Sequence, residues 1–583
     1  MSDDKELSPV EHIKIASNYL RGTIADGLAD ELTGSIAEDD TQLTKFYGFY
    51  QQDNRDLRTE RKHSKLEPHY QFMLRLRLPA GVVTGEQYLA IDDLAHKYAN
   101  GTLRLTTRQT FQYHGVLKKH LRPLLQDAYK VAVDARGACG DVNRNVMATA
   151  NPHLSALHTE VHDWSVKISE HLAWKSRAYE EIFLEQPPRG EDHEPIYGKT
   201  YLPRKFKIAI AIPPENDVDL FANDIGLIAI VEDGQLAGFN IAIGGGMGTT
   251  HGDEATYPRL GSVIGFATPE QTLEAVETLV KIQRDHGDRS DRKHARFKYT
   301  IDDHGIDWIH AQLAERMGWS LAEARDYKFE RNGDPLGWAR DDSGSWHLSL
   351  FIENGRIADF DAKGTAFHGQ YLGRSGYKLM TGLRELAKIH KGTIRLTGNQ
   401  NLIIANVAPE DKAAIEELVA HYELDDGSRN STLRYSAMAC VAFPTCGLAM
   451  AESERYLPEL VGKLEAVVDD AGLSDQPIVI RMTGCPNGCA RPFLGEIGFV
   501  GKAPGKYNLY LGAGFDGARL NKLYRENIGE EEILSELTPM IQRYAAEREE
   551  GEPFGDFVIR AGIIAETIEG RDFHENVGSP QAA

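Results

Sequence analysis

The chain has 583 residues, of which 41% are hydrophobic and 26% charged, and 65 basic residues against 87 acidic ones give a net charge of −22. The composition is typical of globular proteins, and at about 150 residues per domain the length predicts about four domain-sized units. So acidic a chain is a poor candidate for general binding to nucleic acid or to anionic membrane surfaces, which excludes these two classes of function.

The first sixty residues are interpreted as an extension. They begin with the acidic stretch MSDDKELSPVEH, which lacks the apolar region of a secretory signal. No segment of the chain approaches the ~18 apolar residues of a membrane span. We therefore expect a cytoplasmic protein that has no membrane partner.

Two short modules with the order strand, helix, strand follow along the chain. In the first, residues 72–78 alternate and end at Pro79, residues 86–98 have helical spacing, and residues 102–107 read as a second strand. The same order returns later, at residues 346–352, 382–390 and 393–396. We expect small α/β sandwich modules that are used twice.

An internal duplication relates the two halves of the chain. LRLTTRQT, which begins at Leu103, has a counterpart in IRLTGNQN, which begins at Ile394, and the offset of 291 also carries Met147 onto Met438. Further along, an offset of 272 carries residues 208–214 onto 480–486 and 224–227 onto 496–499. Chance matches between common strand sequences are the alternative, but order and spacing both agree with duplication.

The predicted fold is α+β, with duplicated ferredoxin-like α/β half-modules, two larger mixed α/β modules and a pseudo-twofold relation between the halves. The expected units are an N-terminal extension (1–60), a first half-module (61–150), a first large module (151–340), a second half-module (341–425) and a second large module (426–583).

The glycine run of residues 244–248 does not bind a dinucleotide by the usual motif. Thr249 stands where the third glycine of GxGxxG is needed, and no HExxH motif is present. The run predicts a tight turn or a close approach of the backbone to a cofactor. The sequence offers no site for NADPH or flavin.

Four of the five cysteines form two tight pairs, Cys440-x5-Cys446 and Cys485-x3-Cys489. Four thiolates are what a cubane iron–sulfur cluster requires. Structural zinc is an alternative, but it prefers C-x2–4-C spacing, which neither pair matches well. Four buried thiols without a ligand are a further alternative. We interpret the remaining cysteine, Cys139, as a structural thiol.

The cysteine pairs stand in the segments MACVAFPTC and TGCPNGC, and the chain also contains YLRGTIADGL, FYGFYQQDNRD, KLEPH, RLTTRQTFQYHG, NRNV, TYLPRKFK, FNIAIGGGM, LFIENGRI and NQNLIIA. In these segments, which extend over nearly its whole length, the chain resembles the siroheme-dependent sulfite and nitrite reductases. The resemblance implies a [4Fe-4S] cluster on Cys440, Cys446, Cys485 and Cys489, with Cys489 also the axial ligand of the siroheme iron.

The implied activity is the six-electron reduction of sulfite to sulfide, in sulfate assimilation and cysteine biosynthesis. Nitrite reduction on the same scaffold is the alternative, because it also uses six electrons. A protein of another class, which carries cofactors without substrate turnover, is a third hypothesis. The basic residues of the first half argue against that carrier, since a pure carrier needs no anion pocket.

The resemblance also assigns basic and polar residues to ligands. Siroheme carries eight carboxylates and sulfite is a dianion, so burying them requires cationic partners. Lys205 and Lys207 are two apart, which places them on one face of a strand. The residues implied for sulfite are Arg75, Arg144, Lys205 and Lys207, and those implied for siroheme are Arg104, Arg108, Arg204, Lys298, Gln400 and Asn487.

Other readings of these residues stay open. An isolated Lys or Arg is usually a solvated surface charge, and that reading persists for Lys298 and Arg204. Gln112 and His114 lie beside the proposed cations in sequence, and we interpret His114 as a hydrogen-bonding framework residue.

The duplication predicts a division of labour between the halves. The first-half positions opposite the four cysteines are Thr149, Ser155, Pro213 and Asp217, so the first half has no cluster ligand. We expect the second half to hold the electron source, the first half to hold the anion, and siroheme to lie between them.

The electrons must come from a partner, because no nucleotide or flavin motif is present. The resemblance implies a flavoprotein alpha subunit in a hetero-oligomer, which carries FAD and FMN and takes hydride from NADPH. A ferredoxin is the alternative donor. The unduplicated extension is a candidate docking element, or it simply wraps the core.

Overall fold

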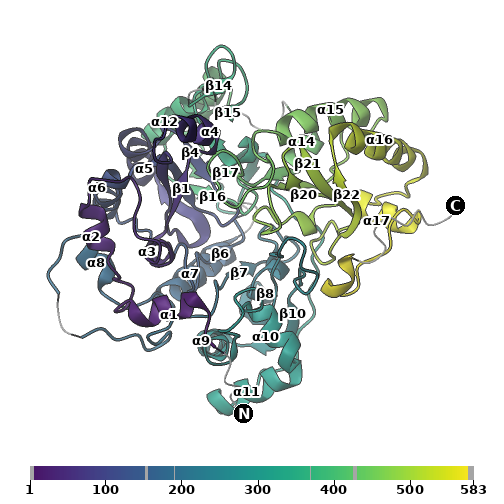
Figure 1. Ribbon diagram of the computed structural model, residues 1–583. Helices are drawn as coiled ribbons and strands as arrows, with labels where there is room; N and C mark the ends of the chain where they lie inside the picture. Colours follow the sequence, from purple (N-terminus) through teal and green to yellow (C-terminus); the bar gives the residue numbers. More distant parts are fainter. Residues whose placement is uncertain are drawn as a thin grey trace.

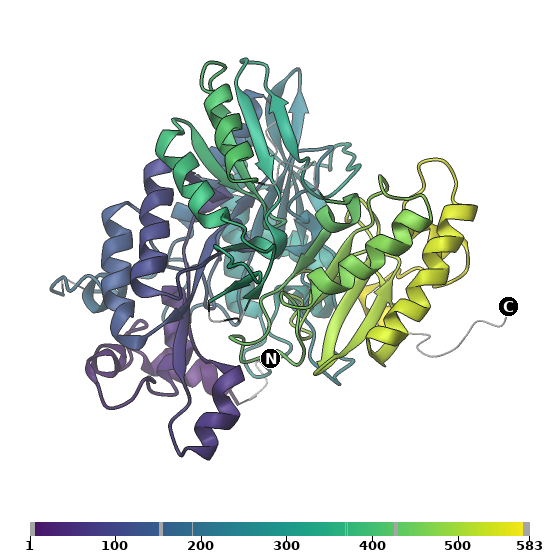
Figure 2. The ribbon, with the colours of Figure 1, turned by 90° about the horizontal axis from the view of Figure 1, so that it is seen from above.

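Four five-stranded sheets and one short hairpin make up the strands of the computed structural model, which describes residues 6–150, 155–188, 191–367, 369, 371–424 and 430–574 (Figure 1). The hairpin consists of β14 (Thr365–Ala366) and β15 (Tyr371–Leu372). Figure 2 shows the second large module as a lobe at one side, with the N-terminal segments on the other side.

The first two sheets have the same strand order and exchange one strand. The first runs β1-β2-β5-β4-β13 and the second β11-β12-β17-β16-β3. Their strands are β1 (Phe49–Asp53), β2 (Tyr70–Arg75), β5 (Phe111–Val116), β4 (Leu103–Leu105), β13 (Arg356–Ile357), β11 (Gly337–Arg340), β12 (Trp346–Leu350), β17 (Leu402–Val407), β16 (Thr393–Leu396) and β3 (Val82–Thr84). Strand β13 of the second half pairs with β4, and β3 of the first half pairs with β16. Each half-module is therefore completed by the other.

The two large modules also share one topology. Their sheets run β6-β7-β8-β9-β10 and β18-β19-β20-β21-β22, and in each the first two pairings are parallel and the last two antiparallel. The strands are β6 (Met147–Ala148), β7 (Ile208–Ala211), β8 (Ile225–Glu232), β9 (Gln235–Ile243), β10 (Ser262–Ala267), β18 (Ala437–Ala439), β19 (Ile480–Thr483), β20 (Ile497–Ala503), β21 (Lys506–Leu511) and β22 (Lys522–Ile528). The predicted duplication agrees with this order.

Helices cover the sheets. They are α1 (Pro9–Ala16), α2 (Ile24–Ala29), α3 (Asp40–Leu43), α4 (Arg58–His63), α5 (Gly85–Tyr98), α6 (Lys118–Lys130), α7 (Ala156–His171), α8 (Ala178–Ile182), α9 (Pro269–His286), α10 (Phe297–His304), α11 (Ile306–Met317), α12 (Leu379–Ile389), α13 (Lys412–His421), α14 (Thr432–Tyr435), α15 (Leu457–Asp470), α16 (Glu530–Glu547) and α17 (Phe554–Arg560). In the half-modules, α5 packs on α6 and α12, and α12 packs on α13. One apolar core runs through both half-modules and the first large module, while the second large module has a core of its own. No helix among the described residues is both long and apolar enough to cross a membrane.

The predicted elements of the half-modules are confirmed. The expected helix at 86–98 is α5, which a capping box at Thr84 and Gln87 starts one residue earlier. The expected strand at 102–107 is the shorter β4, because Thr106 already forms a turn by donating its backbone N–H to the carbonyl of Thr110.

The expected extension packs into the body of the protein. Strand β1 pairs with β2 in the first sheet, with Phe49 opposite Leu74. Helix α1 is fixed by Lys14, whose ammonium donates to the carbonyl of Leu202 at 2.7 Å, and by an ion pair between Glu11 and Arg289. These contacts favour the reading that the extension wraps the core.

We expect Phe49→Ala to lower the free energy of unfolding by about 3–5 kcal/mol, because it leaves a cavity in the core. Phe49 is fully buried and its ring meets those of Phe72 and Phe183 edge to face. Leu32→Ala, at a side chain that is 97% exposed in the same extension, is the control and should change it by less than about 0.5 kcal/mol. Urea denaturation measures both, and equal small effects would show that the extension is not part of the folding unit.

Candidate cofactor and anion site

The cysteine loops follow two neighbouring parallel strands. Cys440 comes directly after β18, and Cys485 follows β19 by two residues, so both lie at the carboxyl ends of paired strands. That edge is where open α/β sheets bind ligands. The Sγ atom of Cys440 accepts a hydrogen bond from the backbone N–H of Gly484 at 3.3 Å, which ties the two loops together.

The four thiols lie close to one another. Burial raises the pKa of Cys485, and negative charge on Cys489, Cys440 and Cys446 raises it further. Burial and Cys489 likewise raise the pKa of Cys440 to about 12. Thiols with such raised pKa values are stabilised as thiolates by a bound metal centre.

The loops also supply N–H donors to sulfur, as iron–sulfur proteins do. The Asn487 side chain donates to Cys485 Sγ at 3.6 Å. Burial and Cys489 raise the pKa of Cys446, and the N–H groups of Leu448 and Ala449 oppose this rise. No three His, Cys, Asp or Glu side chains of the described ranges surround a single ion position. A cubane cluster does not require that, because its thiolates sit at separate corners. The residues present therefore fit a [4Fe-4S] cluster.

A group of basic side chains from the first half faces these loops. Lys205 and Lys207 immediately precede β7, and the backbone N–H of Arg144 bonds to the Phe206 carbonyl between them. The negative charge of Cys489 acts on the pKa of Lys205, which places this lysine near the exposed thiol of the other half. The structure therefore brings the predicted anion residues and a predicted cluster residue to one place.

These cations have no counter-ions in the part of the chain that the structure describes. Buried carboxylates of the region are bonded elsewhere, since Asp141 pairs with Arg292 and Asp224 with Arg296. The cations without a described carboxylate within ion-pair distance are Arg75, Arg108, Arg144, Arg204, Lys205 and Lys207. Gathering like charges in this way is unfavourable unless an anion joins them.

Burial and neighbouring cations lower the pKa values of several of these side chains. Burial, then Arg204 and Arg296, lower the pKa of Lys205 to about 7, and burial with Lys205 and Arg108 lowers that of Lys207 well below its usual range. Burial and Arg144 lower the pKa of Arg108 to about 9. An anionic cofactor or substrate would reverse each of these shifts.

The residues predicted to hold siroheme line the same region. Arg104 donates to the carbonyl of Ala439 at 2.8 Å and Gln400 donates to it at 3.0 Å, directly before Cys440. Arg108 donates to the Asn223 side chain at 2.8 Å. Buried polar atoms left without a hydrogen bond include Nε of Arg108 and Oε1 of Gln400, whereas Nε of Arg104 lies 3.2 Å from a carboxylate oxygen of Glu454. Buried polar atoms are normally bonded, so the residues fit a polar, anionic macrocycle.

Lys298 is placed differently. Its ammonium donates to the carbonyls of Gly246, Gly248 and Tyr257, which use all three of its hydrogens. The glycine run in turn lies against the cysteine loop, since Thr249 donates its N–H to the Pro486 carbonyl at 2.9 Å. The run does not form the tight turn that the sequence predicted: Gly246 makes an isolated bridge with Arg259, and Gly248 lies against the backbone of Asn487. Lys298 holds this segment through the carbonyls of Gly246 and Gly248.

His114 takes part in a hydrogen-bonded chain between the halves. Arg75 donates to Gln112 at 2.9 Å, Gln112 contacts His114 at 2.6 Å, and His114 contacts the Thr445 hydroxyl at 3.5 Å. Thr445 directly precedes Cys446. This arrangement agrees with a framework role for His114, whose pKa burial and three nearby arginines hold well below its usual range.

Sequence reasoning missed several residues of the site. Tyr50, from the extension, acts on the pKa of Arg144 and so lies near it, and Cys139 accepts from Arg75 at 3.1 Å. Arg296 acts on the pKa values of Lys205 and Lys207. The position of Tyr50 within FYGFYQQDNRD was the available signal, because that segment was already singled out.

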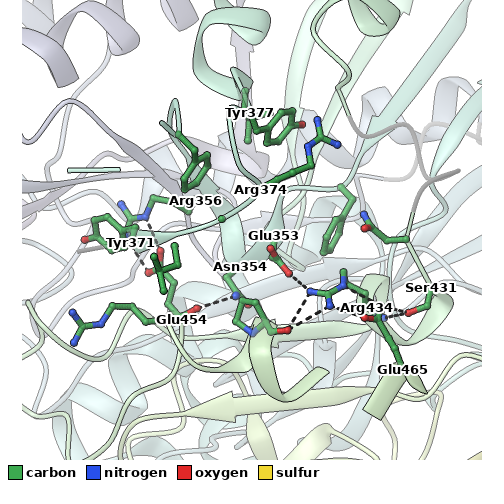
Figure 3. Close-up of a pocket in the computed structure, with 18 of the residues that line it drawn as sticks. Glu353, Asn354, Arg356, Tyr371, Arg374, Tyr377, Ser431, Arg434, Glu454 and Glu465 are labelled. Carbon is green, nitrogen blue, oxygen red and sulfur yellow. Dashed lines mark hydrogen bonds and ion pairs between the residues drawn. The ribbon is translucent and has the colours of Figure 1, made fainter. Parts of the chain in front are cut away.

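A cavity of about 550 Å³ lies away from these residues, beside the hairpin β14–β15 (Figure 3). Its charges are paired, since Arg356 donates to Glu454 at 2.6 and 3.0 Å and Arg434 binds Glu353 and Glu465. None of the residues predicted for the site lines it. We therefore place the candidate site at the unpaired cations.

Comparison with protein families gives two matches. The model described as nitrite and sulphite reductase 4Fe-4S domain matches residues 163–321, and the model described as nitrite/sulfite reductase ferredoxin-like half domain matches residues 63–131 and 339–422. The double match confirms the expected pair of ferredoxin-like modules. Residues 163–321 contain no cysteine, so the candidate cluster loops lie outside the matched segments.

Curated relatives match over nearly the full length. The protein named "Sulfite reductase [NADPH] hemoprotein beta-component" of Shouchella clausii is 58% identical over 579 residues, which cover 98% of this chain and 99% of that one. The protein of the same name from Bacillus subtilis is 57% identical over 576 residues, which cover 98% of each. The solved structure of the Mycobacterium tuberculosis NirA protein has a TM-score of 0.77 at 23% identity and covers 95% of this chain and 97% of that one, a likeness of fold alone.

Replacing Cys446 by Ser should remove most of the acid-labile sulfide and most of the cluster iron. In the unaltered protein we expect about four sulfides per chain and about five irons, four in the cluster and one in siroheme. Colorimetric iron and sulfide assays on purified protein measure this. Cys139→Ala is the matched control, because this thiol is not among the four in the loops, and its iron content should stay unchanged. Equal iron in both variants would contradict the assignment.

Proposed function

The chain belongs to the nitrite and sulphite reductase family, and on that premise we propose that it is the siroheme-carrying subunit of a sulfite reductase. The net reaction adds six electrons and seven protons to sulfite and yields hydrosulfide and three water molecules. It serves sulfate assimilation and cysteine biosynthesis. Nitrite reduction on the same scaffold is the alternative.

One observation carries the proposal. Six basic side chains have no counter-ion among the described residues, and one of them, Lys205, lies near Cys489, which is close to the three other thiols. A zinc-binding or purely structural cysteine group gives no reason for such charges, nor does an electron carrier without a substrate. A cofactor with many carboxylates and a small dianionic substrate accounts for both groups at once.

The cofactor residues divide between the two halves. Cys440, Cys446, Cys485 and Cys489 would hold the cluster, and Cys489 would also hold siroheme through its iron. When bound, siroheme supplies an iron to which the substrate sulfur coordinates, and the cluster supplies electrons to it. Arg104, Arg108, Arg204, Gln400 and Asn487 would bind the carboxylates, with Lys298 acting through the glycine run.

The basic residues have two different tasks. Arg75 and Arg144 stay protonated and stabilise negative charge on the substrate. Lys205 is the better proton donor, because an ammonium group releases its proton more readily than a guanidinium. Lys207 assists on the same strand face.

The electron donor is a second subunit. The name of the curated relatives, a beta-component, implies a partner component in those proteins. We propose a flavoprotein alpha subunit with FAD and FMN that oxidises NADPH, in a cytoplasmic hetero-oligomer, since this chain has no motif for those cofactors. Docking of that partner by the N-terminal extension stays a prediction. The observed contacts of the extension are with the core of this chain.

The test is an absorption spectrum of the purified protein followed by turnover with dithionite-reduced methyl viologen. We expect chlorin-type bands and sulfide formation from sulfite, with nitrite the poorer substrate by kcat/KM. Absence of the bands would remove siroheme from the proposal. Bands without turnover would support the carrier, and a large preference for nitrite would support the alternative.

The affinity for sulfite should weaken as the pH rises above about 7. Lys205 has a pKa of about 7 and loses its proton as the pH rises through that value. Sulfite as a dianion binds best when Lys205 is protonated. Above pH 7, binding of sulfite therefore requires Lys205 to take up a proton. This linkage weakens binding by up to about tenfold per pH unit. In Lys205→Arg the guanidinium stays protonated and KM should rise less between pH 7 and 9. An equal rise in both proteins would assign the effect to sulfite itself.

A further inference from the structure

Arg491, two residues after Cys489, is bonded to three other modules. Its Nε donates to Asp219 of the first large module, Nη1 to the carbonyl of Thr107 of the first half-module at 2.9 Å, and Nη2 to the carbonyl of Gly398 of the second half-module at 2.8 Å. The side chain is buried. One guanidinium thus joins all four modules.

The internal duplication relates two of the partners to each other and the third partner to Arg491 itself. Thr107 and Gly398 are 291 positions apart, and Asp219 and Arg491 are 272 apart, which are the two offsets of the repeat. Arg491 therefore binds the carbonyls of two equivalent residues and the side chain of its own counterpart. In an isologous twofold arrangement, a residue meets its counterpart only at the axis.

The backbone supports this equivalence. Asp219 (φ 45°, ψ 60°) and Arg491 (φ 52°, ψ 53°) both adopt the left-handed conformation, and each directly precedes a 3-10 turn, Leu220–Ala222 and Pro492–Leu494. Non-glycine residues adopt this conformation infrequently, so its occurrence at both equivalent positions is informative. Duplication has kept the backbone and changed the side chains to opposite charges.

Asp219 and Arg491 form a buried ion pair, and a second arginine also binds Asp219. Arg481 also donates to Asp219. Burial works to raise the pKa of Asp219, but Arg481 and Arg491 outweigh it and the pKa is lowered. Removing one partner from a buried pair leaves an uncompensated charge, so neither residue is replaceable by a neutral one without cost.

The same contacts fix the backbone at Cys489. The Thr107 hydroxyl donates to the Cys489 carbonyl at 3.0 Å, while the Thr107 carbonyl accepts from Arg491. On the other side, Asn223 donates to the Asp219 carbonyl at 3.0 Å and accepts from Arg108 at 2.8 Å. The pair therefore connects the thiol-bearing loop with a cation of the anion half.

We propose that Arg491 is a positioning residue, which together with Asp219 and Thr107 sets the place of Cys489 relative to the cations of the first half. The proposal rests on the proposed function, in which Cys489 links the two cofactors. Lysine cannot replace arginine here, because its single ammonium cannot reach three partners in the fixed directions of a guanidinium.

The experiment compares Arg491→Lys with a control, Glu465→Gln, in the holoenzyme. Glu465 binds Arg434 within the same module at 2.6 and 3.0 Å and has no bond to the Cys489 loop. In Arg491→Lys we expect iron content within twofold of the unaltered protein, shifted chlorin bands, and at least a tenfold loss of viologen-driven sulfite turnover. In the control, bands and turnover should be unchanged. Unchanged bands and turnover in Arg491→Lys would overturn the proposal.

Thr107→Val provides a milder variant if Arg491→Lys does not fold. It removes only the hydroxyl that bonds to the Cys489 carbonyl, and we expect a smaller band shift with the thermal midpoint within about 2 °C of the unaltered protein. Bands identical to those of the unaltered protein would overturn the proposal.

Failure of the proposed function is separable from failure of this inference. If the unaltered protein shows no chlorin bands, the function fails. Calorimetry of the cofactor-free protein then tests the role of the Asp219–Arg491 pair. We expect one unfolding transition in the unaltered chain and two transitions in Arg491→Gln. A single transition in that variant would overturn the inference as well.

Discussion

Uncompensated positive charge inside an acidic protein is the constraint on which the rest of this structure depends. Lys205, Lys207 and Arg144 stand around strand β7, and the buried carboxylates of that region are bonded to other arginines. Cations gathered in this way repel one another, and an anion bound among them would stabilise the fold.

The duplicated architecture explains how cations and thiols came to face each other. In the second large module the cysteines follow the carboxyl ends of β18 and β19. In the first large module the cations Arg144, Lys205 and Lys207 precede β6 and β7, so they lie at the amino ends of the equivalent strands. A site between two copies can diverge on each side without changing the topology of either.

Much of the fold and part of the site could be predicted from the sequence. Alternation, helical spacing and capping are local signals, so β2, α5 and β16 were predictable, and the spacing of the cysteines pointed to a cluster. Tyr50 and Arg491 could not be predicted in this way. Arg491 bonds to Asp219 across 272 positions, and in the sequence each looks like an ordinary charged residue near a turn. Long-range contacts of single residues leave no periodic pattern.

The exchange of β3 and β13 has a consequence for synthesis of the chain. Strand β3 pairs with β16, which the ribosome makes roughly 300 residues later. At a synthesis rate of about 5–20 residues per second, β3 stays without this partner strand for about 15–60 s. Unpaired edges are templates for aggregation. Newly made chains are therefore most vulnerable before translation ends, and protection by chaperones at that stage should govern the yield of folded protein.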